Sequence, residues 1–404
     1  MEMPEQNQRT HYKIVIVGGG SAGISVAARL LRKSRDLFGK IAIVDFATKH
    51  YYQPLWTLAG AGAVKKDITE REEAAVIPSG AIWVQDAVAE FSPDENAVIT
   101  ASRTKLHYDY LVVAAGIQID WDKVKGLKES IGKHGVCSNY SYDYVDSTWD
   151  NIRHFKGGTA IFTNPNTPVK CGGAPQKIMY LADDYFRKSG VRSQSSIRFV
   201  SGGASIFGVK KYADALQKVI ERKQIETHFK HNLIEIAGDK KQAVFENLNT
   251  NERVVMPYDM IHVVPPMSAP DFIKHSPLAA SDGWLDVDKY TLQHKRFANV
   301  FGVGDCTNLP TSKTGAAIRK QGPVVVQNLL SLIDGKQVGS KYDGYTSCPL
   351  VTGYGKLILA EFDYEMNPKE TFPFDQSRER RSMYWLKKEM LPLMYWKGML
   401  KGTM

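Results

Sequence analysis

The stretch HYKIVIVGGGSAGISVAARLL, residues 11–31, decides the fold predicted for this chain. Its apolar run Tyr12–Val17 leads directly into six small residues, Gly18–Gly23, and a helical pattern of apolar residues follows. Gly18 permits a tight turn, Gly20 lets a pyrophosphate approach the backbone, and Gly23 lets helix and strand lie close together. Because a strand, a turn and a helix in this order place phosphate at a helix N-terminus, the stretch predicts a dinucleotide-binding site.

The next apolar run supports this prediction. Residues 41–44 form a short apolar stretch that ends in Asp45. An acidic side chain at this strand end is placed to accept hydrogen bonds from a ribose diol. The alternative is a glycine-rich loop of a generic α/β sheet.

Two more buried strands favour flavin over nicotinamide. The run 111–116 ends in Ala115 and Gly116, and the run 300–305 ends in Gly304 and Asp305. Both resemble motifs of flavoproteins with two dinucleotide-binding domains, in which the acid of the second motif binds the ribityl chain of FAD. Ala115 stands where that family typically has threonine. Asp305 as a helix cap is the alternative, since aspartate is a favoured capping residue.

A second glycine-rich turn follows the predicted strand 197–200. Its third glycine, Gly208, comes two places too late for the fingerprint, and residues 209–212 supply no acid for a ribose. We expect this strand to open a second Rossmann-like unit that lacks a nicotinamide site. Electrons must then reach the flavin from another donor.

Two cysteines lie in settings suited to reactive thiols. Cys171 precedes a predicted helix that has Pro175 in its first turn, and Lys170 and Lys177 lie nearby. The helix dipole and these charges favour a thiolate. Cys348 lies in a turn-like stretch between Gly344 and Gly353. Neither cysteine has a partner at metal or thioredoxin spacing, so the two can join only through the fold.

Four stretches resemble the sulfide:quinone oxidoreductase family, in particular its mitochondrial-like branch. They are NTPVKCGGAPQKIMYL (166–181), FGVKKYADAL (207–216), GDCTNLPTSKT (304–314) and YDGYTSCPLVTGY (342–354), and the resemblance extends from Tyr12 to about Lys397. It implies that Cys171 and Cys348 form a redox disulfide beside FAD. The third active-site cysteine of another branch has no counterpart, because Cys137 lies in a different context.

The resemblance also implies a reaction. Hydrosulfide attacks the Cys171–Cys348 bridge, leaving a persulfide on Cys348 and releasing Cys171 as a thiolate toward the flavin. Two electrons move into FAD and then to a quinone, ubiquinone or menaquinone. The bridge is restored when the outer sulfur passes to sulfite, a thiol of glutathione type, or coenzyme A.

The candidate site residues follow from these motifs. Lys177 is a candidate for steadying an incoming anion, with a solvated surface lysine as the alternative. Tyr354 and Phe362 are quinone-site candidates, and core packing is their alternative. Cys137 and Cys306 are predicted to be structural. No metal is predicted. The cofactor-binding candidates are Gly18, Gly20, Ser21, Ala22, Gly23, Asp45, Gln53, Ala115, Gly116, Gly304, Asp305 and Lys313.

The C-terminal segment mixes large apolar residues with lysines. Pro392 divides residues 383–401 into two short amphipathic pieces, which are too charged to span a bilayer but suited to its interface. Trp385, Tyr395 and Trp396 are residue types that favour the headgroup level. We expect a membrane-facing extension through which a quinone enters. A helical hairpin that closes the core, or a dimer interface, is the alternative.

Composition sets the remaining limits. The chain has 404 residues, 43% hydrophobic and 24% charged, as in an ordinary globular protein. We predict an α/β fold with two Rossmann-like doubly wound domains: a FAD domain split into 12–121 and 285–340, a second domain at 122–284, and an extension at 341–404. The net charge of +9 is concentrated among apolar residues near the C-terminus, which favours a membrane surface over nucleic acid.

Location and function remain partly open from sequence. Met1–Thr10 is polar, so no cleavable signal is predicted. We expect a peripheral protein on the cytoplasmic face of a prokaryotic membrane, or on the matrix face of the mitochondrial inner membrane if a presequence is missing. A homo-oligomer is an option. The functional alternatives are an NAD(P)H-dependent quinone or disulfide reductase of the same fold and a non-catalytic flavoprotein.

Overall fold

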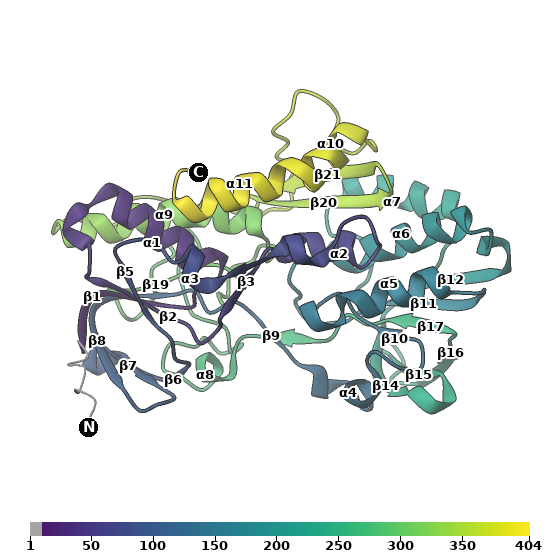
Figure 1. Ribbon diagram of the computed structural model, residues 1–404, viewed down its shortest axis with the longest axis horizontal. Helices are drawn as coiled ribbons and strands as arrows, with labels where there is room; N and C mark the ends of the chain where they lie inside the picture. The colour runs from purple at the N-terminus through teal and green to yellow at the C-terminus, as the bar shows by residue number, and fades with distance from the viewer. Residues whose placement is uncertain (1–9) are drawn as a thin grey trace, which may run out of the picture.

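Two sheets organise the computed structural model, which describes residues 10–404 (Figure 1). The larger sheet has the order β5-β2-β1-β8-β7-β6, and β19 also pairs with β8. Residues 1–9, on which the signal-peptide prediction rests in part, lie outside the described residues. The strands of this sheet are β1 (His11–Val17), β2 (Ile41–Val44), β5 (Ala81–Val84), β6 (Val88–Ser92), β7 (Ala97–Thr100), β8 (Lys105–Val113) and β19 (Val300–Gly302).

Strand β1 lies at the centre of this sheet and runs parallel to β2 and β8. Its apolar run is buried because helices cover parallel sheets on both faces. The turn to α1 (Ser21–Lys33) needs its glycines: a Cβ on Gly18 would lie 2.4 Å from the Ala114 carbonyl oxygen, and one on Gly23 would lie 1.9 Å from that of Gly18. The predicted Rossmann-like α/β fold is confirmed.

The second sheet has the order β10-β17-β11-β12-β13 and is parallel throughout. Its central strands alternate with helices that lie along it in Figure 1. The strands are β10 (Val136–Cys137), β11 (Gly158–Asn164), β12 (Ser195–Ser201), β13 (Glu226–Phe229) and β17 (Met260–His262), and the helices are α5 (Val145–His154), α6 (Ala174–Lys188) and α7 (Lys210–Lys223).

The strand order corrects the interpretation of the second unit. β11 lies between β12 and β17 and is followed by α6, as β1 lies between β2 and β8 and is followed by α1. The strand at 197–200 is therefore the second of its unit and does not open it. The turn equivalent to the phosphate-binding turn is 165–173, which contains Cys171. At the glycine-rich turn after β12, a Cβ on Gly202 would lie 2.6 Å from the Asn166 amide nitrogen.

Smaller elements connect and cover the two sheets. A three-stranded antiparallel sheet joins β14, β15 and β16, and three strand pairs stand apart from the main sheets. The elements are β14 (His231–Ala237), β15 (Gln242–Asn247), β16 (Arg253–Pro257), the pairs β3 (Lys49–Tyr51) with β4 (Glu70–Glu72), β9 (Gln118–Ile119) with β18 (Met267–Ser268) and β20 (Thr346–Gly353) with β21 (Lys356–Phe362), and the helices α2 (Trp56–Ala59), α3 (Glu73–Val76), α4 (Leu127–Ser130), α8 (Asp271–Lys274) and α9 (Gly315–Ile333).

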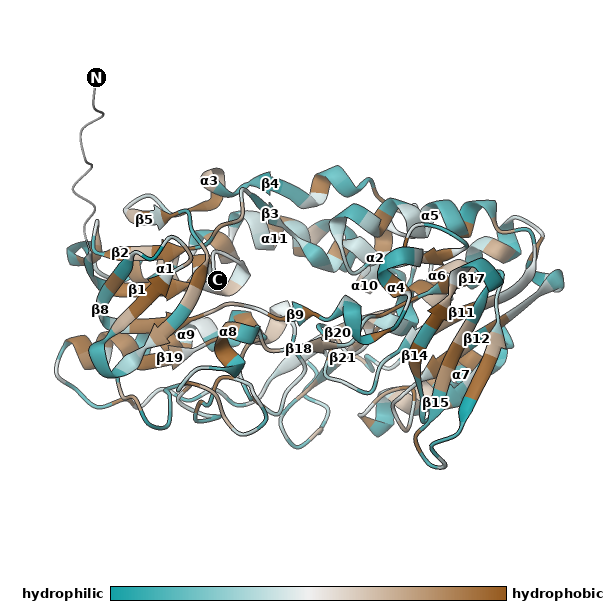
Figure 2. Ribbon diagram, turned by 90° about the horizontal axis from the view of Figure 1, so that it is seen from below, coloured by the Kyte–Doolittle hydropathy of each residue, from teal (hydrophilic) through white to brown (hydrophobic). Residues whose placement is uncertain are grey.

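The hydrophobic core follows the strands of the two main sheets. In Figure 2 the most hydrophobic stretches are the central strands, with hydrophilic residues on the surrounding helices and loops. The large sheet receives strands from both residues 11–113 and residues 300–302. The domain limits 12–121, 122–284, 285–340 and 341–404 stay predictions.

The C-terminal segment is one bent helical run. It consists of α10 (Arg381–Trp385), a π-helical turn η9 (Leu386–Met390), α11 (Leu391–Lys397) and a short 3₁₀ turn η10 (Met399–Lys401). Pro392 does not separate two pieces, because it lies in the first turn of α11, where a missing N–H is tolerated. Figure 1 shows this segment crossing the molecule from the β20–β21 hairpin to α1. Its membrane-facing character stays a prediction.

Candidate active site

A cavity of about 610 Å³ lies between the phosphate-binding turn, the Cys171 turn and the C-terminal helical run. Its volume is in the range that holds cofactor-sized ligands. The wall includes Cys171 and Lys177 on one side, and Leu386, Lys387, Leu391, Met394, Tyr395 and Met399 of the C-terminal run.

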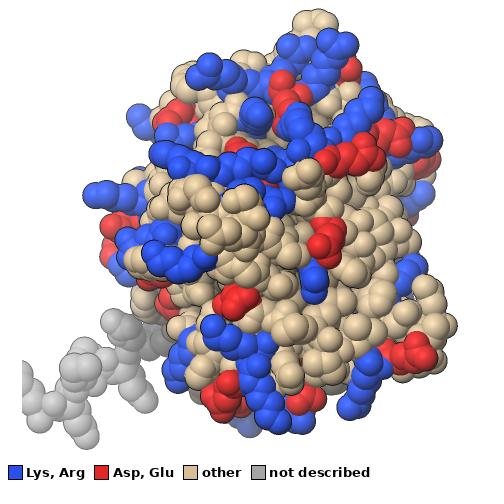
Figure 3. Space-filling view, turned by 90° about the vertical axis from the view of Figure 1, so that its right-hand side faces the viewer, with Lys and Arg blue, Asp and Glu red and all other residues tan. Residues whose placement is uncertain are grey.

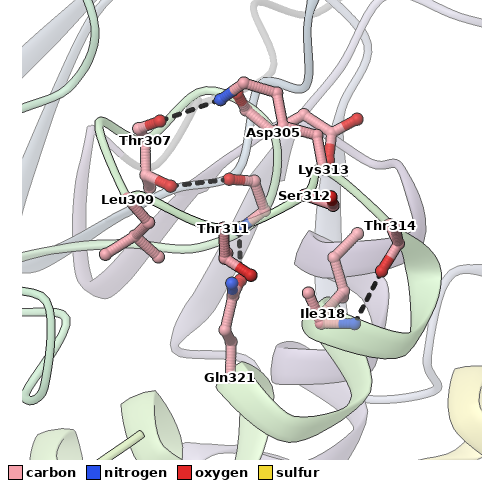
Figure 4. Close-up of a pocket in the computed structure, with 11 residues that line it drawn as sticks. Asp305, Thr307, Leu309, Thr311, Ser312, Lys313, Thr314, Ile318 and Gln321 are labelled. Carbon is pink, nitrogen blue, oxygen red and sulfur yellow. Dashed lines mark hydrogen bonds between the residues drawn. The ribbon is translucent and has the colours of Figure 1, made fainter. Parts of the chain in front are cut away.

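Most cofactor candidates line this cavity. Gly23 does not, because it packs against Gly18, and Gly304 instead lines a small adjoining hollow next to Asp305 (Figure 4). The candidates on the cavity wall are Gly18, Gly20, Ser21, Ala22, Asp45, Gln53, Ala115, Gly116, Asp305 and Lys313.

The phosphate-binding turn suits a pyrophosphate. Helix α1 begins after Gly20 without a side-chain cap, so the amide groups of its first turn have no intrahelical acceptor. A Cβ on Gly20 would meet nothing within 4 Å, so the backbone there is open to the cavity. Asp45 accepts hydrogen bonds from the amides of Gly19 (2.6 Å) and Ala47 (2.8 Å) and is thereby held at the cavity edge.

Asp305 supplies a buried acceptor. Its Oδ1 is buried without a hydrogen-bond partner, and burial raises the pKa of this carboxyl despite the charges of Lys313 and Lys170. Lys313 Nζ donates to the carbonyl oxygens of Asp305 (2.6 Å) and Thr307 (3.0 Å) (Figure 4). An orphaned buried oxygen needs a donor, which a ribityl hydroxyl would provide. The residues present therefore fit a flavin dinucleotide.

Asp305 is not a helix cap. Helix α9 begins at Gly315, and its cap is Thr314, whose hydroxyl accepts from the Ala317 amide. The helix-cap alternative for Asp305 is wrong.

Cys171 occupies the turn between β11 and α6. Its φ of +57° lies in the left-handed region, which is strained for a residue with a side chain. The backbone amide of Cys171 donates to the Lys313 carbonyl (2.7 Å), so the thiol turn is tied to the loop that carries Lys313.

Cys348 reaches the same place from a different element. It lies within strand β20 and not in a turn, pairs with Ala360 of β21 and is fully buried. A Cβ on Gly173 would lie 2.3 Å from Leu350 Cδ2 and 3.7 Å from Cys348 Cβ. Glycine at this position therefore lets the start of α6 press against β20 and brings the two cysteines together.

The two thiols interact directly, and their pKa values move in opposite directions. Contact with Cys348 lowers the pKa of Cys171 well below its usual range, aided by the charges of Lys177 and Lys387 and opposed by burial. Contact with Cys171, together with burial, raises the pKa of Cys348 well above its usual range. All four cysteines are free in the structure. These opposite directions favour a thiolate at Cys171 over one at Cys348.

Two buried lysines flank this thiolate. Lys177 is only 3% exposed, and its Nζ donates to Cys171 Sγ (3.2 Å), so the solvated-lysine alternative is wrong. Lys387 comes from the π-helical turn of the C-terminal run, and its Nζ donates to the Pro54 carbonyl (3.0 Å). Burial, and secondarily the charge of Lys177, lowers the pKa of Lys387 to about 7.

Lys170 links the thiol turn to another cofactor candidate. Its Nζ donates to Gln53 Oε1 (2.7 Å) and lies over the Trp56 ring (5.2 Å). Burial lowers the pKa of Lys170 to about 8, and the charge of Asp305 opposes that shift. The positive charges of Lys170 and Lys313 therefore both face the region around Asp305.

The quinone-site candidates do not reach the cavity. The Tyr354 hydroxyl donates a hydrogen bond to the Ala61 carbonyl, and the Tyr354 backbone amide donates one to the Asp184 carboxylate. Phe362 is 2% exposed and packs against Phe207, with the ring centroids 5.8 Å apart. In the part of the chain that the structure describes, neither residue lines the cavity. Both placements therefore favour the core-packing alternative. Aromatic residues that do line it include Tyr345 and Phe372.

The other two cysteines are buried away from this chemistry. Cys137 Sγ donates to the Ile261 carbonyl (3.6 Å) and Cys306 Sγ to that of Val113 (3.5 Å). Burial raises the pKa of Cys137 to about 12 and that of Cys306 to about 11. Both placements are those of inert buried thiols.

Sequence reasoning missed three residues that the fold brings to the cavity region. Tyr395 was predicted at a lipid headgroup level, but it is 6% exposed and hydrogen-bonded to Ser21 and His50. His50 in turn contacts Glu73. No local pattern marks these residues, because each acquires its role only from packing against a distant segment.

Known proteins resemble this chain over most of its length. The profile of the family described as pyridine nucleotide-disulphide oxidoreductase matches residues 12–143. The mitochondrial sulfide:quinone oxidoreductase of Mus musculus is 53% identical over 98% of this chain and 87% of its own length. That of Dictyostelium discoideum is also 53% identical, over 96% and 86%.

A solved structure shares the fold at lower identity. The crystal structure of the sulfide:quinone oxidoreductase from Aquifex aeolicus superposes with a TM-score of 0.83 at 18% identity, over 98% of this chain and 92% of the other. The likeness of the fold and the identity to the mitochondrial proteins lead to one conclusion. The chain belongs to the sulfide:quinone oxidoreductase family, in its mitochondrial branch, and is a flavin-dependent oxidoreductase.

Proposed function

We propose that this enzyme oxidises hydrosulfide at a Cys171–Cys348 disulfide and passes two electrons through FAD to a membrane quinone. The observation that carries the proposal is the direct contact of the two thiols beside the flavin-binding cavity, with Lys177 and Lys387 buried next to them. Names of the mitochondrial relatives support sulfide and quinone as the substrates.

The first step is thiol–disulfide exchange. Hydrosulfide forms a bond to Cys348 Sγ, the Cys348–Cys171 bond breaks, and Cys171 leaves as a thiolate. A good leaving group is a thiol of low pKa, and the pKa of Cys171 is lowered by Cys348 and the two lysines. The same positive charges draw the anionic substrate into the cavity.

The second part of the cycle restores the disulfide. A small acceptor, such as sulfite, glutathione or coenzyme A, takes the outer sulfur of the Cys348 persulfide and leaves Cys348 as a thiolate. Closing the bridge between two thiolates releases one electron pair. FAD, when bound, supplies the two-electron acceptor for that pair and the route to the quinone. Lys313 and Asp305 would hold it by its polar groups.

The C-terminal helical run supports membrane contact. Trp385 is 57% exposed and Leu393 is 45% exposed, whereas neighbouring residues face the cavity. Arg381 at the start of this run is exposed as well. Figure 3, which faces the right-hand end of Figure 1, shows Lys and Arg side chains over the upper part of that end, mixed with Asp and Glu. Apolar anchors beside basic residues suit an anionic lipid surface. Among residues 10–404, no helix is long and apolar enough to cross a bilayer.

The relatives also support a location. We propose that the protein lies peripherally on the mitochondrial inner membrane or the corresponding prokaryotic membrane, because three of the similar curated proteins are named mitochondrial. Leu386, Leu391 and Met394 line the cavity next to the exposed anchors and give a quinone an apolar route to the flavin.

A stopped-flow experiment tests the proposal. The oxidised, FAD-loaded protein is mixed anaerobically with sulfide, and the flavin absorbance is followed; a second sample receives NADH. We expect sulfide to bleach the flavin and C171S and C348S to abolish that bleaching, while Cys137→Ser, at a cysteine outside the cavity, leaves it intact. Bleaching by NADH alone would establish the reductase alternative, and bleaching by neither would remove the proposed activity.

A further inference from the structure

A hydrogen-bonded chain joins the C-terminal helix to the phosphate-binding turn. Tyr395 of α11 places its hydroxyl 2.7 Å from Ser21 Oγ, at the first residue of α1. The same hydroxyl lies 2.5 Å from His50 Nε2, and His50 Nδ1 lies 3.1 Å from Glu73 Oε2. Four side chains from α1, β3, α3 and α11 thus form one chain that ends at the proposed pyrophosphate site.

This chain is shielded from water. Tyr395 is 6% exposed, His50 is 4% exposed and Glu73 is 2% exposed. Buried hydrogen bonds of this kind hold their groups firmly, because breaking one leaves an unpaired polar group without water. Glu73 Oε1 has no partner, and a Cβ on Gly19 would lie 2.7 Å from it, so the unpaired oxygen lies against the phosphate-binding turn.

Ring contacts hold α11 in the same position. The Tyr52 and Tyr395 rings are tilted by 39° with centroids 4.6 Å apart, and the Arg71 guanidinium lies over the Trp396 ring at 4.9 Å. Beyond α11, the chain turns back onto α1: a Cβ on Gly402 would lie 2.7 Å from the Arg29 amide nitrogen. The C-terminal run therefore closes the side of the cavity that lies over the start of α1.

We propose that α11 is a latch on the flavin dinucleotide, in which Tyr395 positions the Ser21 hydroxyl for the pyrophosphate and cofactor binding in turn fixes the C-terminal run. The chain of donors permits this. When the ring proton of His50 is on Nε2, that N–H donates to the Tyr395 hydroxyl, Tyr395 donates to Ser21, and the Ser21 proton is free for an anion.

The coupling is reciprocal. If docking of α11 raises the affinity for the cofactor by some factor, binding of the cofactor must raise the equilibrium constant for docking of α11 by the same factor. Tyr395 thereby acts as a positioning residue through Ser21, in addition to its packing. The inference rests on the proposal that the cofactor is FAD.

Cofactor titration tests the latch. FAD is added to the apoprotein of the full chain, and binding is followed by quenching of flavin fluorescence. Y395F keeps the ring and removes the hydroxyl, and we expect it to bind FAD about tenfold more weakly, the effect of losing one buried hydrogen bond. Tyr384→Phe is the matched control, because Tyr384 lies in the same run and the described residues give its hydroxyl no hydrogen bond.

A second substitution tests the route through Ser21. Ser21→Ala removes the hydroxyl that Tyr395 positions, so the S21A/Y395F double variant should bind FAD no more weakly than S21A alone. Additive losses would mean that Tyr395 acts independently of Ser21 and would overturn that part of the inference.

Limited trypsin digestion tests the reciprocal effect. We expect FAD to slow cleavage after Lys397 and Lys401 in the wild-type and Y384F proteins, with much less protection in Y395F, as read by mass spectrometry of the fragments. Equal FAD affinity in Y395F and wild type, or FAD-independent cleavage in wild type, would overturn the latch. Failure of the wild-type apoprotein to bind FAD at all would instead refute the cofactor proposal.

Discussion

Replacing Lys177 by methionine tests how the active-site thiolate is maintained. The Nζ of Lys177 lies 3.2 Å from Cys171 Sγ, and the side chain is 3% exposed, so little water competes for the contact. Methionine keeps the approximate length of the chain and removes the charge. We expect the pKa of Cys171 to rise, because one of the groups that lower it is lost.

The size of the effect follows from the kind of contact removed. A buried hydrogen bond to a charged group contributes about 1.5–3 kcal/mol. The lower end applies here, because the Cys348 contact and the Lys387 charge remain. Since 1.4 kcal/mol corresponds to about tenfold in an equilibrium, the thiolate fraction on the acidic side of the titration should fall by about tenfold.

Alkylation kinetics provide the assay. The reduced protein reacts with iodoacetamide over a range of pH, and modification of Cys171 is followed by mass spectrometry. In K177M the rate profile should move to higher pH, with a rate about tenfold lower on its acidic limb. Lys188→Met, at an exposed lysine at the end of the same helix, is the control. A K177M profile that coincides with wild type would show that the thiolate is maintained without Lys177 and would refute this reasoning.

Three further outcomes are expected. Burial lowers the pKa of Lys387 to about 7, so the residue is cationic below that pH and neutral above it. Cys171 should therefore prefer anionic iodoacetate over neutral iodoacetamide less strongly as the pH rises through about 7. In K387M this pH-dependent change in preference should be absent. Asp305→Ala removes the buried acceptor and should weaken FAD binding by about tenfold in fluorescence titrations, whereas unchanged binding would exclude Asp305 from the cofactor site. Burial alone raises the pKa of Asp183, but Arg187, Lys223 and Arg192 lower it overall, so this carboxylate stabilises the fold at neutral pH and loses that effect in acid. D183N should cost about 3 kcal/mol of unfolding free energy in urea denaturation near neutral pH. This cost should shrink progressively as the pH falls below the ordinary aspartate pKa of 3.8, and a cost that does not change in acid would contradict the ion-pair argument.

Sequence was most informative where local backbone geometry is decisive. The strands at 12–17 and 41–44 were predicted closely, because apolar runs bounded by glycine or an acid have few alternatives. The helix after Cys171 was predicted from Pro175 and the apolar pattern. Long family-like stretches around both cysteines identified the family, which the comparisons confirm.

Predictions failed where strand order or long-range packing decides. A glycine-rich turn after the strand at 197–200 resembled a fingerprint, yet only pairing shows that β11 holds the central place. Cys348 was expected in a turn, although pairing with β21 makes it part of a strand. Tyr395 and Lys387 of the C-terminal run were assigned to a lipid surface but are buried at the cavity, since amphipathic patterns do not distinguish a membrane from the protein's own cavity.

The amino-acid sequence alone determined the dinucleotide turn, the α/β class and the placement of a reactive cysteine at the start of a helix. Each depends on neighbouring residues, through backbone dihedral angles, helix dipoles and the period of apolar side chains. Only the tertiary structure brought Cys348 to Cys171, buried Lys177 and Lys387 beside them, and returned Tyr395 to Ser21. Those distances arise from the packing of elements far apart in the chain, which local periodicity does not encode.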